Sequence, residues 1–143
     1  MRQPVHILMV DDNPADIDLV REALGESQRP FRLESLADGE AALSLLSHSP
    51  QALGLPDLML LDLNLPRQDG RRVLAEMKAD PHTATIPVVI FTTSQAKTDV
   101  RCSYALGANC YLRKPGTLAE FRAAVRCLAD FWLGHVTLAP KEN

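Results

Sequence analysis

The sequence predicts an α/β fold: a doubly wound five-stranded parallel sheet, in the order 2-1-3-4-5, with five helices. Two observations predict it. Short apolar runs alternate along the chain with segments whose apolar residues repeat at helical spacing. Turn residues separate the two kinds of segment, and no internal repeat or linker interrupts them. At 143 residues and 46% hydrophobic composition, the chain is expected to form one domain with a sizeable core.

The first two strand-helix units fill the amino-terminal third of the chain. Val5 to Val10 is a near-continuous apolar run, as expected of a strand buried on both faces. Asn13-Pro14 supplies a capping side chain and a proline at the first helical position, and the apolar spacing of this helix continues to Gly25. Phe31 to Leu36 is a second, more polar strand, expected near a sheet edge. Asp38-Gly39 begins the next helix.

Three further units follow. Leu58 to Leu61 is the third predicted strand, and Asp69-Gly70 begins its helix. Pro87 to Phe91 is the fourth strand, and its helix ends at Gly107, which is expected to be a C-terminal cap. Asn109 to Leu112 is the fifth strand.

The last predicted helix begins with a capping box made by Thr117 and Glu120. Apolar residues at helical spacing mark the side of this helix that should be buried. They are Leu118, Phe121, Val125, Leu128 and Trp132.

Polar side chains stand at the carboxyl ends of four of these strands. Asp11 and Asp12 end the first strand, Asp62 the third, Thr92 the fourth and Lys114 the fifth. Ligands of doubly wound sheets bind beyond these ends, where the strand order reverses, here between the first and third strands. The three aspartates are therefore expected to converge. A single aspartate at a strand end is usually a turn or cap residue, but the recurrence at four strands favours a site.

Three converging carboxylates repel one another unless a cation compensates them. Because all the candidate ligands are oxygens, Mg²⁺ is expected rather than zinc. With Asp62 as nucleophile, a hydroxyl donor at Thr92 and an ammonium at Lys114, the group suits in-line phosphoryl transfer. The sequence has neither a Walker A motif nor GxGxxG, so the phosphoryl donor is expected to be a phosphorylated residue of another protein.

Four segments, VDDNP, LLDLNLPRQDG, PVVIFTTS and YLRKP, resemble in this order the receiver domains of two-component response regulators. The resemblance covers about residues 5 to 131 and implies a flavodoxin-like receiver fold, assigned to residues 1–133. It implies that Asp62 accepts phosphate from a histidine kinase. It further implies that Asp12 and Asp62 bind Mg²⁺ directly with the backbone carbonyl of Asn64, and that Asp11 acts through water.

The same resemblance implies a switch. Thr92 and Tyr111 match the switch pair of the family, in which the hydroxyl moves toward the phosphoryl group and vacates space for the aromatic ring. Lys114 matches the family lysine, and the Lys114–Pro115 peptide bond is expected to be cis. Thr93 departs from the alanine that many receivers carry, and its bulk is expected to restrict access to the acyl phosphate and slow its loss.

Residues 134–143 form a tail after the last helix, assigned as a candidate dimer contact. The ending FWLGHVTL either marks an interface or folds back over its own core, and the sequence leaves both open. With NLPRQDG and NCYLRKP it is similar to the single-domain regulators of bacterial phytochrome kinases. That likeness implies a phytochrome-type histidine kinase as donor, output through protein contact, and a homodimer built from the fourth helix, fifth strand, fifth helix and tail.

Composition argues against several other functions. A net charge of -3 does not favour nucleic-acid binding. With no signal peptide and no apolar run of about 18 residues, a cytoplasmic protein without membrane contact is expected. Cys102, Cys110 and Cys127 lack CxxC spacing, so neither a disulfide framework nor zinc is indicated. A phosphoacceptor signalling protein is therefore expected rather than an enzyme. The alternatives are a phosphate-independent interaction module and an aspartyl-phosphate hydrolase, which would need a general acid and an enclosing loop.

Overall fold

The computed structural model describes residues 3–48 and 54–140 of the chain. Its strands form one parallel sheet in the order β2-β1-β3-β4-β5, which confirms the predicted fold and strand order. The strands are β1 (Val5–Val10), β2 (Phe31–Leu36), β3 (Leu58–Leu61), β4 (Val88–Thr92) and β5 (Cys110–Arg113). The last two begin and end one residue later than predicted.

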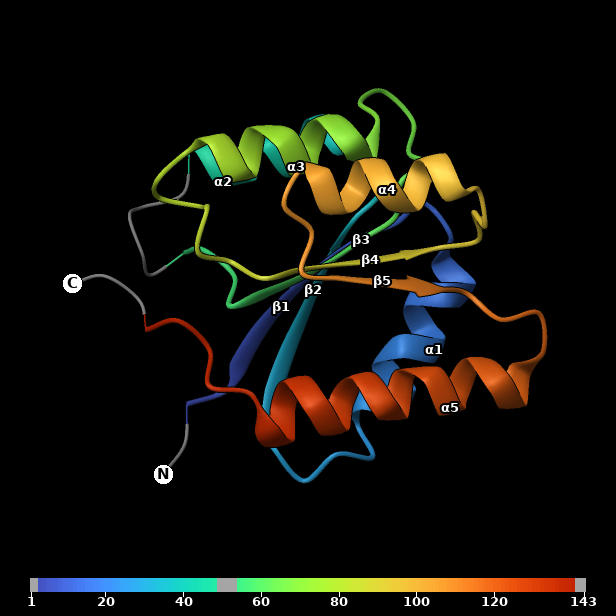
Figure 1. The fold of residues 1–143 in the computed structure, drawn as a ribbon. Coiled ribbons are helices and arrows are strands. Elements are labelled where there is room, and N and C mark those ends of the chain that lie inside the picture. Colours follow the sequence, from blue (N-terminus) through green and yellow to red (C-terminus); the bar gives the residue numbers. More distant parts are fainter. Residues whose placement is uncertain (1–2, 49–53, 141–143) are drawn as a thin grey trace.

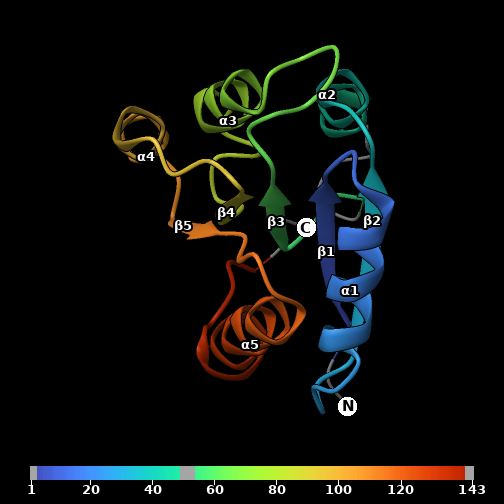
Figure 2. The ribbon, with the colours of Figure 1, turned by 90° about the vertical axis from the view of Figure 1, so that its right-hand side faces the viewer.

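Helices cover both faces of the sheet, as Figures 1 and 2 show. On one face lie α1 (Pro14–Leu24) and α5 (Leu118–Ala129), and α5 continues into the π-helical turn η1 (Asp130–His135). On the other face lie α2 (Gly39–His48), α3 (Gly70–Ala79) and α4 (Lys97–Ala105).

The pleat of β1 divides its side chains between two apolar cores. Ile7 and Met9 pack with residues of α1 and α5, whereas Leu8 and Val10 pack with residues of α2 and α3. All six residues of β1 are buried, which confirms a strand covered on both faces. The sheet is therefore a rigid middle layer, and its carboxyl edge can hold polar groups in fixed positions.

The helix ends follow the predicted capping chemistry. The Asn13 side chain accepts hydrogen bonds from the backbone of Ala15 and Asp16, at 3.0 and 3.3 Å. The Thr117 hydroxyl accepts one from the backbone N–H of Glu120 at 3.2 Å. Gly107 has a φ of 109°, the left-handed conformation expected of a glycine after a helix.

Two sequence predictions about the carboxyl-terminal third are wrong. Leu118 was predicted to lie on the buried side of α5, but it is 54% exposed, because this first helical residue precedes the part of α5 that packs on the sheet. The Lys114–Pro115 bond was predicted to be cis, but the described peptide bonds are all trans. The trans form is the lower-energy form of X-Pro, by about 0.5–1 kcal/mol, and it already brings Lys114 to the carboxylates described below.

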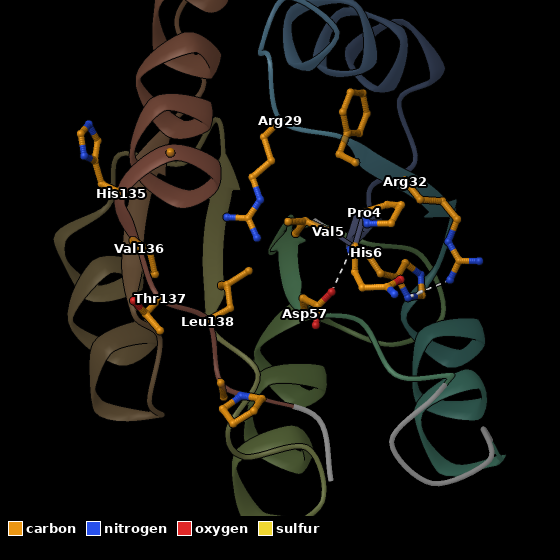
Figure 3. Close-up of a pocket in the computed structure, with 15 residues that line it drawn as sticks. Pro4, Val5, His6, Arg29, Arg32, Asp57, His135, Val136, Thr137 and Leu138 are labelled. Atoms are coloured by element: carbon orange, nitrogen blue, oxygen red, sulfur yellow. Dashed lines mark hydrogen bonds between the residues drawn. The ribbon is translucent and has the colours of Figure 1, made fainter. Parts of the chain in front are cut away.

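The tail folds back over its own domain. Trp132 and Leu133 of η1, just before the tail, are buried, and Val136 and Leu138 of the tail pack against the core that α1 and α5 share. Figure 3 shows Val136 and Leu138 on one side of a cavity of about 1040 Å³, with Val5 facing them and Arg29 between. Arg29 donates a hydrogen bond to the Leu133 carbonyl at 2.9 Å.

The tail cavity lies at the opposite sheet edge from the predicted site, because Val5 begins β1 and Asp11 follows its end. The last three residues, 141–143, lie outside the described part of the chain. Across the ranges 3–48 and 54–140, no helix is both long and apolar enough to cross a bilayer.

Candidate phosphoryl-acceptor site

Three carboxylates converge at the carboxyl edge of the sheet. Asp11 and Asp12 follow β1, Asp62 follows the neighbouring strand β3, and the Asp62 N–H donates to the Val10 carbonyl at 3.0 Å. One oxygen from each of the three carboxylates lies within 4.8 Å of the others. Asp11 and Asp62 are buried, whereas Asp12 is exposed. The predicted convergence of these three side chains is therefore what the fold produces.

Backbone hydrogen bonds orient the two buried carboxylates. Oδ1 of Asp11 accepts from the N–H of Asn13 at 2.9 Å, and Oδ1 of Asp62 accepts from the N–H of Asn64 at 3.2 Å. In both residues the second oxygen, Oδ2, faces Lys114. The same short-range pattern, a carboxylate bound to the backbone two residues later, thus points both acceptors at one cation.

Lys114 is the buried cation at the centre of the site. Its Nζ lies 2.6 Å from Asp11, 2.9 Å from Asp16 and 3.3 Å from Asp62. Burial alone would lower the pKa of Lys114, but its hydrogen bonds to Asp11 and Asp16 outweigh burial, so the pKa is raised. The ammonium therefore stays charged at neutral pH and can pair with an anionic group placed on Asp62.

The carboxylates still carry more negative charge than one lysine balances. Burial raises the pKa of Asp11, although the hydrogen bonds from Lys114 and from the Asn13 N–H oppose the rise. A group of carboxylate oxygens short of positive charge is the donor set that hard divalent cations bind. Asp11, Asp12 and Asp62 therefore fit a divalent metal ion, with Asp12 on the solvent side.

Thr92 and Tyr111 lie on adjacent strands beside this group. The buried Thr92 ends β4, and its hydroxyl oxygen is 3.5 Å from the N–H of Ser94, a weak contact. The hydroxyl of Tyr111 donates to the carbonyl of Ser94 at 3.0 Å. Both side chains predicted to form a switch therefore contact the same residue of the β4–α4 loop. Thr93, which lies between Thr92 and Ser94 in the sequence, is exposed.

A polar network that the sequence did not reveal attaches α4. Asp99 accepts hydrogen bonds from Arg71 and from the Ser94 hydroxyl, both at 2.5 Å. The bond from Ser94, and after it the bond from Arg71, lowers the pKa of the Asp99 carboxyl. Within α4 only Ser103 is buried. This network and a hydrogen bond that the Tyr104 hydroxyl accepts from β5 at 3.1 Å join the helix to neighbouring segments. The residues of the network come from three segments, so no local pattern announces it.

Sequence reasoning also missed Asp16, the third carboxylate on Lys114. Acidic residues are common in the first turn of a helix because they interact well with the helix dipole, so Asp16 carried no distinguishing signal. Only its spacing of one helical turn from Asp12 hinted that both side chains could reach the same end of the sheet.

Comparison with known proteins identifies the family. The model of the response regulator receiver domain matches residues 7–126. The chain is 45% identical over 141 residues to the response regulator Rcp1 of Synechocystis sp., covering 94% of this chain and 93% of Rcp1. It is 39% identical to the probable methanogenesis regulatory protein FilR2 of Methanothrix harundinacea, covering 92% of this chain and 85% of FilR2.

Solved structures agree with these relatives. The Mn²⁺-bound form of Rcp1 matches with a TM-score of 0.90 at 45% identity, covering 95% of this chain and 99% of the other. The phosphorylated cyanobacterial phytochrome response regulator RcpA matches with a TM-score of 0.90 at 42% identity and the same coverage. By its fold, its converging carboxylates and these matches, the chain belongs to the response regulator receiver domain family.

Proposed function

We propose that Asp62 accepts a phosphoryl group from a phosphohistidine of a histidine kinase. The observation that carries the proposal is the convergence of Asp11, Asp62 and the Lys114 ammonium in one buried group at the sheet edge. As in the rest of the receiver family, the chain then acts in signalling. Its reaction serves to change its own surface and not to release a product.

The transfer follows from the orientation of Asp62. With Oδ1 held by the Asn64 N–H, an oxygen of this carboxylate attacks phosphorus, and the bond from phosphorus to the histidine nitrogen breaks. The imidazole keeps the electron pair and takes up a proton. Lys114 then binds a phosphoryl oxygen in place of Asp62 Oδ2, and the Thr92 hydroxyl donates to another.

Mg²⁺ belongs to the proposal as the resident cation. The ligands would be the carboxylates of Asp12 and Asp62 and the backbone carbonyl of Asn64, with Asp11 acting through water. When bound, the ion neutralises phosphoryl oxygens and the excess charge of the carboxylates. The Mn²⁺-bound form of Rcp1, at 45% identity, supports a divalent ion in this family.

The switch is proposed to run through Ser94. When the Thr92 hydroxyl turns toward the phosphoryl group it leaves the Ser94 N–H, and Tyr111, already bonded to the Ser94 carbonyl, repacks with the loop. The altered surface is that of α4, β5 and α5. Loss of the phosphate by autodephosphorylation would reset it.

The proposed donor is a phytochrome-type kinase, supported by the 42% identity to the phytochrome response regulator RcpA. We also place the protein in the cytoplasm, in keeping with three unpaired cysteines. The proposed homodimer uses α4, β5, α5 and the tail. In its support, the exposed large apolar side chains of residues 3–48 and 54–140 all lie on α4, α5 and η1, and they are Tyr104, Leu118 and Phe131.

Label transfer tests the acceptor. Mixed with Mg²⁺ and a labelled phosphohistidine kinase, the native chain is expected to take up the label, and Asp62→Asn to take up none, because an amide oxygen is a poor nucleophile. Asp18→Asn, which neutralises an exposed aspartate of α1, should behave as the native chain does. Label on the Asp62→Asn chain would refute the assignment. If neither the native chain nor any variant took up the label, the protein would be an interaction module. Rapid turnover of small phosphate esters would indicate a hydrolase.

Thr93→Ala is expected to shorten the life of the aspartyl phosphate severalfold, because the smaller side chain opens the pocket to water. The measurement is the decay of label from the isolated phosphoprotein in Mg²⁺ buffer. Thr98→Ala removes the same atoms from an exposed position of α4 and should leave the decay unchanged. An unchanged half-life in Thr93→Ala would contradict the proposed role of this side chain.

Phe131→Asp is expected to dissociate the proposed dimer, because a charge replaces an apolar ring that is 55% exposed. Sedimentation velocity at several concentrations measures the change. Truncation from residue 131 onward is a poorer test, because it would also remove Trp132 and Leu133 of η1 from the core. Ser44→Asp places the same charge on an exposed position of α2, outside the proposed interface, and is the control. The same dimer fraction in Phe131→Asp as in the native chain would remove this side chain from the interface.

A further inference from the structure

Asp16 stands apart from the carboxylates that fit a metal ion, yet it binds their lysine. It is not one of the three residues whose oxygens lie within 4.8 Å of one another. Its Oδ2 lies 2.9 Å from Lys114 Nζ, whereas Oδ2 of Asp62 lies 3.3 Å away. The ammonium therefore rests closer to a carboxylate of α1 than to the proposed phosphoacceptor.

The position of Asp16 is fixed by the start of α1. The Asn13 side chain accepts from its backbone N–H, and the same Asn13 supplies the N–H that orients Asp11. The Asp16 side chain is 19% exposed, so water screens its charge only in part. One short segment, residues 11–16, thus carries two of the three carboxylates that bind Lys114, and Asn13 fixes the positions of both.

The hydrogen bonds of Lys114 are already complete in this arrangement. An ammonium group has three N–H donors, and Asp11, Asp16 and Asp62 accept them. A phosphoryl group on Asp62 releases one donor, because that carboxylate becomes an acyl phosphate. Asp16 keeps its own donor, and it draws the ammonium toward α1 while the phosphoryl oxygens draw it toward β3.

We propose that Asp16 is a positioning residue that holds Lys114 back and so limits how tightly the pocket retains a phosphoryl group on Asp62. The proposal rests on the proposed function of Asp62. The charge of Asp16 acts in opposite directions on the two ligands of the pocket: it favours a divalent cation and opposes a phosphoryl dianion. A residue that only stabilised the fold would change both affinities in the same direction.

Asp16→Asn removes the charge and keeps the shape. In titration calorimetry it is expected to bind Mg²⁺ about two- to fivefold more weakly, the size of effect that a partly exposed ion pair exerts. At saturating Mg²⁺ it is expected to bind beryllofluoride, an analogue of the phosphoryl group, about two- to fivefold more tightly. Asp16→Glu, which restores the charge, should return both affinities toward the native values. Asp18→Asn is the matched control on the same helix.

Each outcome decides the proposal. Opposite shifts in Asp16→Asn, absent in Asp18→Asn, support it. Unchanged affinities, or affinities that fall together, overturn it while leaving Asp62 as the acceptor. A native chain that binds beryllofluoride equally well with and without Mg²⁺, or not at all, overturns the proposed function of Asp62 and this inference with it.

Discussion

Replacement of Lys114 by methionine is expected to lower the free energy of unfolding by about 3 kcal/mol at neutral pH without divalent ions, because it leaves buried carboxylates unpaired. Asp11, Asp16 and Asp62 would lose their shared cation. Mg²⁺ should restore much of the loss, because a divalent ion supplies the missing positive charge and binds only the folded chain. Phosphoryl transfer to Asp62 should nevertheless remain severely reduced, since no ammonium binds the transferred group.

Urea denaturation with and without Mg²⁺ measures this effect. The distinguishing result is that Mg²⁺ raises the midpoint more in Lys114→Met than in the native chain. Lys97→Met changes an exposed lysine at the start of α4 and should match the native midpoints in both buffers. A Lys114→Met protein as stable as the native one in metal-free buffer would show that the carboxylates need no counter-charge.

Gly70→Ala is expected to destabilise the protein by about 1–3 kcal/mol, the range for overpacking a well-packed core. A Cβ on Gly70 would stand 2.2 Å from the backbone oxygen of Asp62 and 2.8 Å from Cα of Leu63. Those atoms belong to the backbone, so no side chain can swing away to make room. The substitution therefore displaces the segment that carries Asp62, and it should weaken Mg²⁺ binding as well as folding.

Gly134→Ala is the matched control, because nothing lies within 4 Å of the Cβ that it would add. Its unfolding midpoint in urea and its Mg²⁺ affinity should stay near the native values. If Gly70→Ala kept both the native midpoint and the native affinity, the close approach of α3 to the end of β3 would have no energetic consequence.

The sheet and the ends of its strands were readable in the sequence because both are local patterns. A buried strand such as Val5–Val10 shows itself by its continuous apolar run, and Asp11 or Asp62 by its place directly after one. The strand order then brought Asp11, Asp12 and Asp62 together without any knowledge of side-chain geometry. The core of the candidate site was therefore predictable.

Contacts made by side chains of the helices, away from the strand ends, were not readable in this way. Asp16 binds Lys114 from 98 positions away, and Arg71 binds Asp99 from 28. The local sequence around Asp16, Arg71 and Asp99 fits an exposed charged side chain on a helix equally well. The tail is a similar case. Its apolar residues Val136 and Leu138 suited a contact with a partner and a contact with their own core equally well. Only the folded structure shows that they pack on the core.

The small number of buried residues in α4 has a consequence for local unfolding of the molecule. Helices α1, α2, α3 and α5 each bury several residues, whereas α4 buries Ser103 alone and is joined to its neighbours by hydrogen bonds of Asp99 and Tyr104. Local opening is cheapest where few buried contacts must be broken. Amide hydrogens of α4 should therefore exchange with solvent before those of the other helices. A brief opening of α4 would bare the edge of the sheet at β5 while the carboxylates at the other strand ends stayed in place.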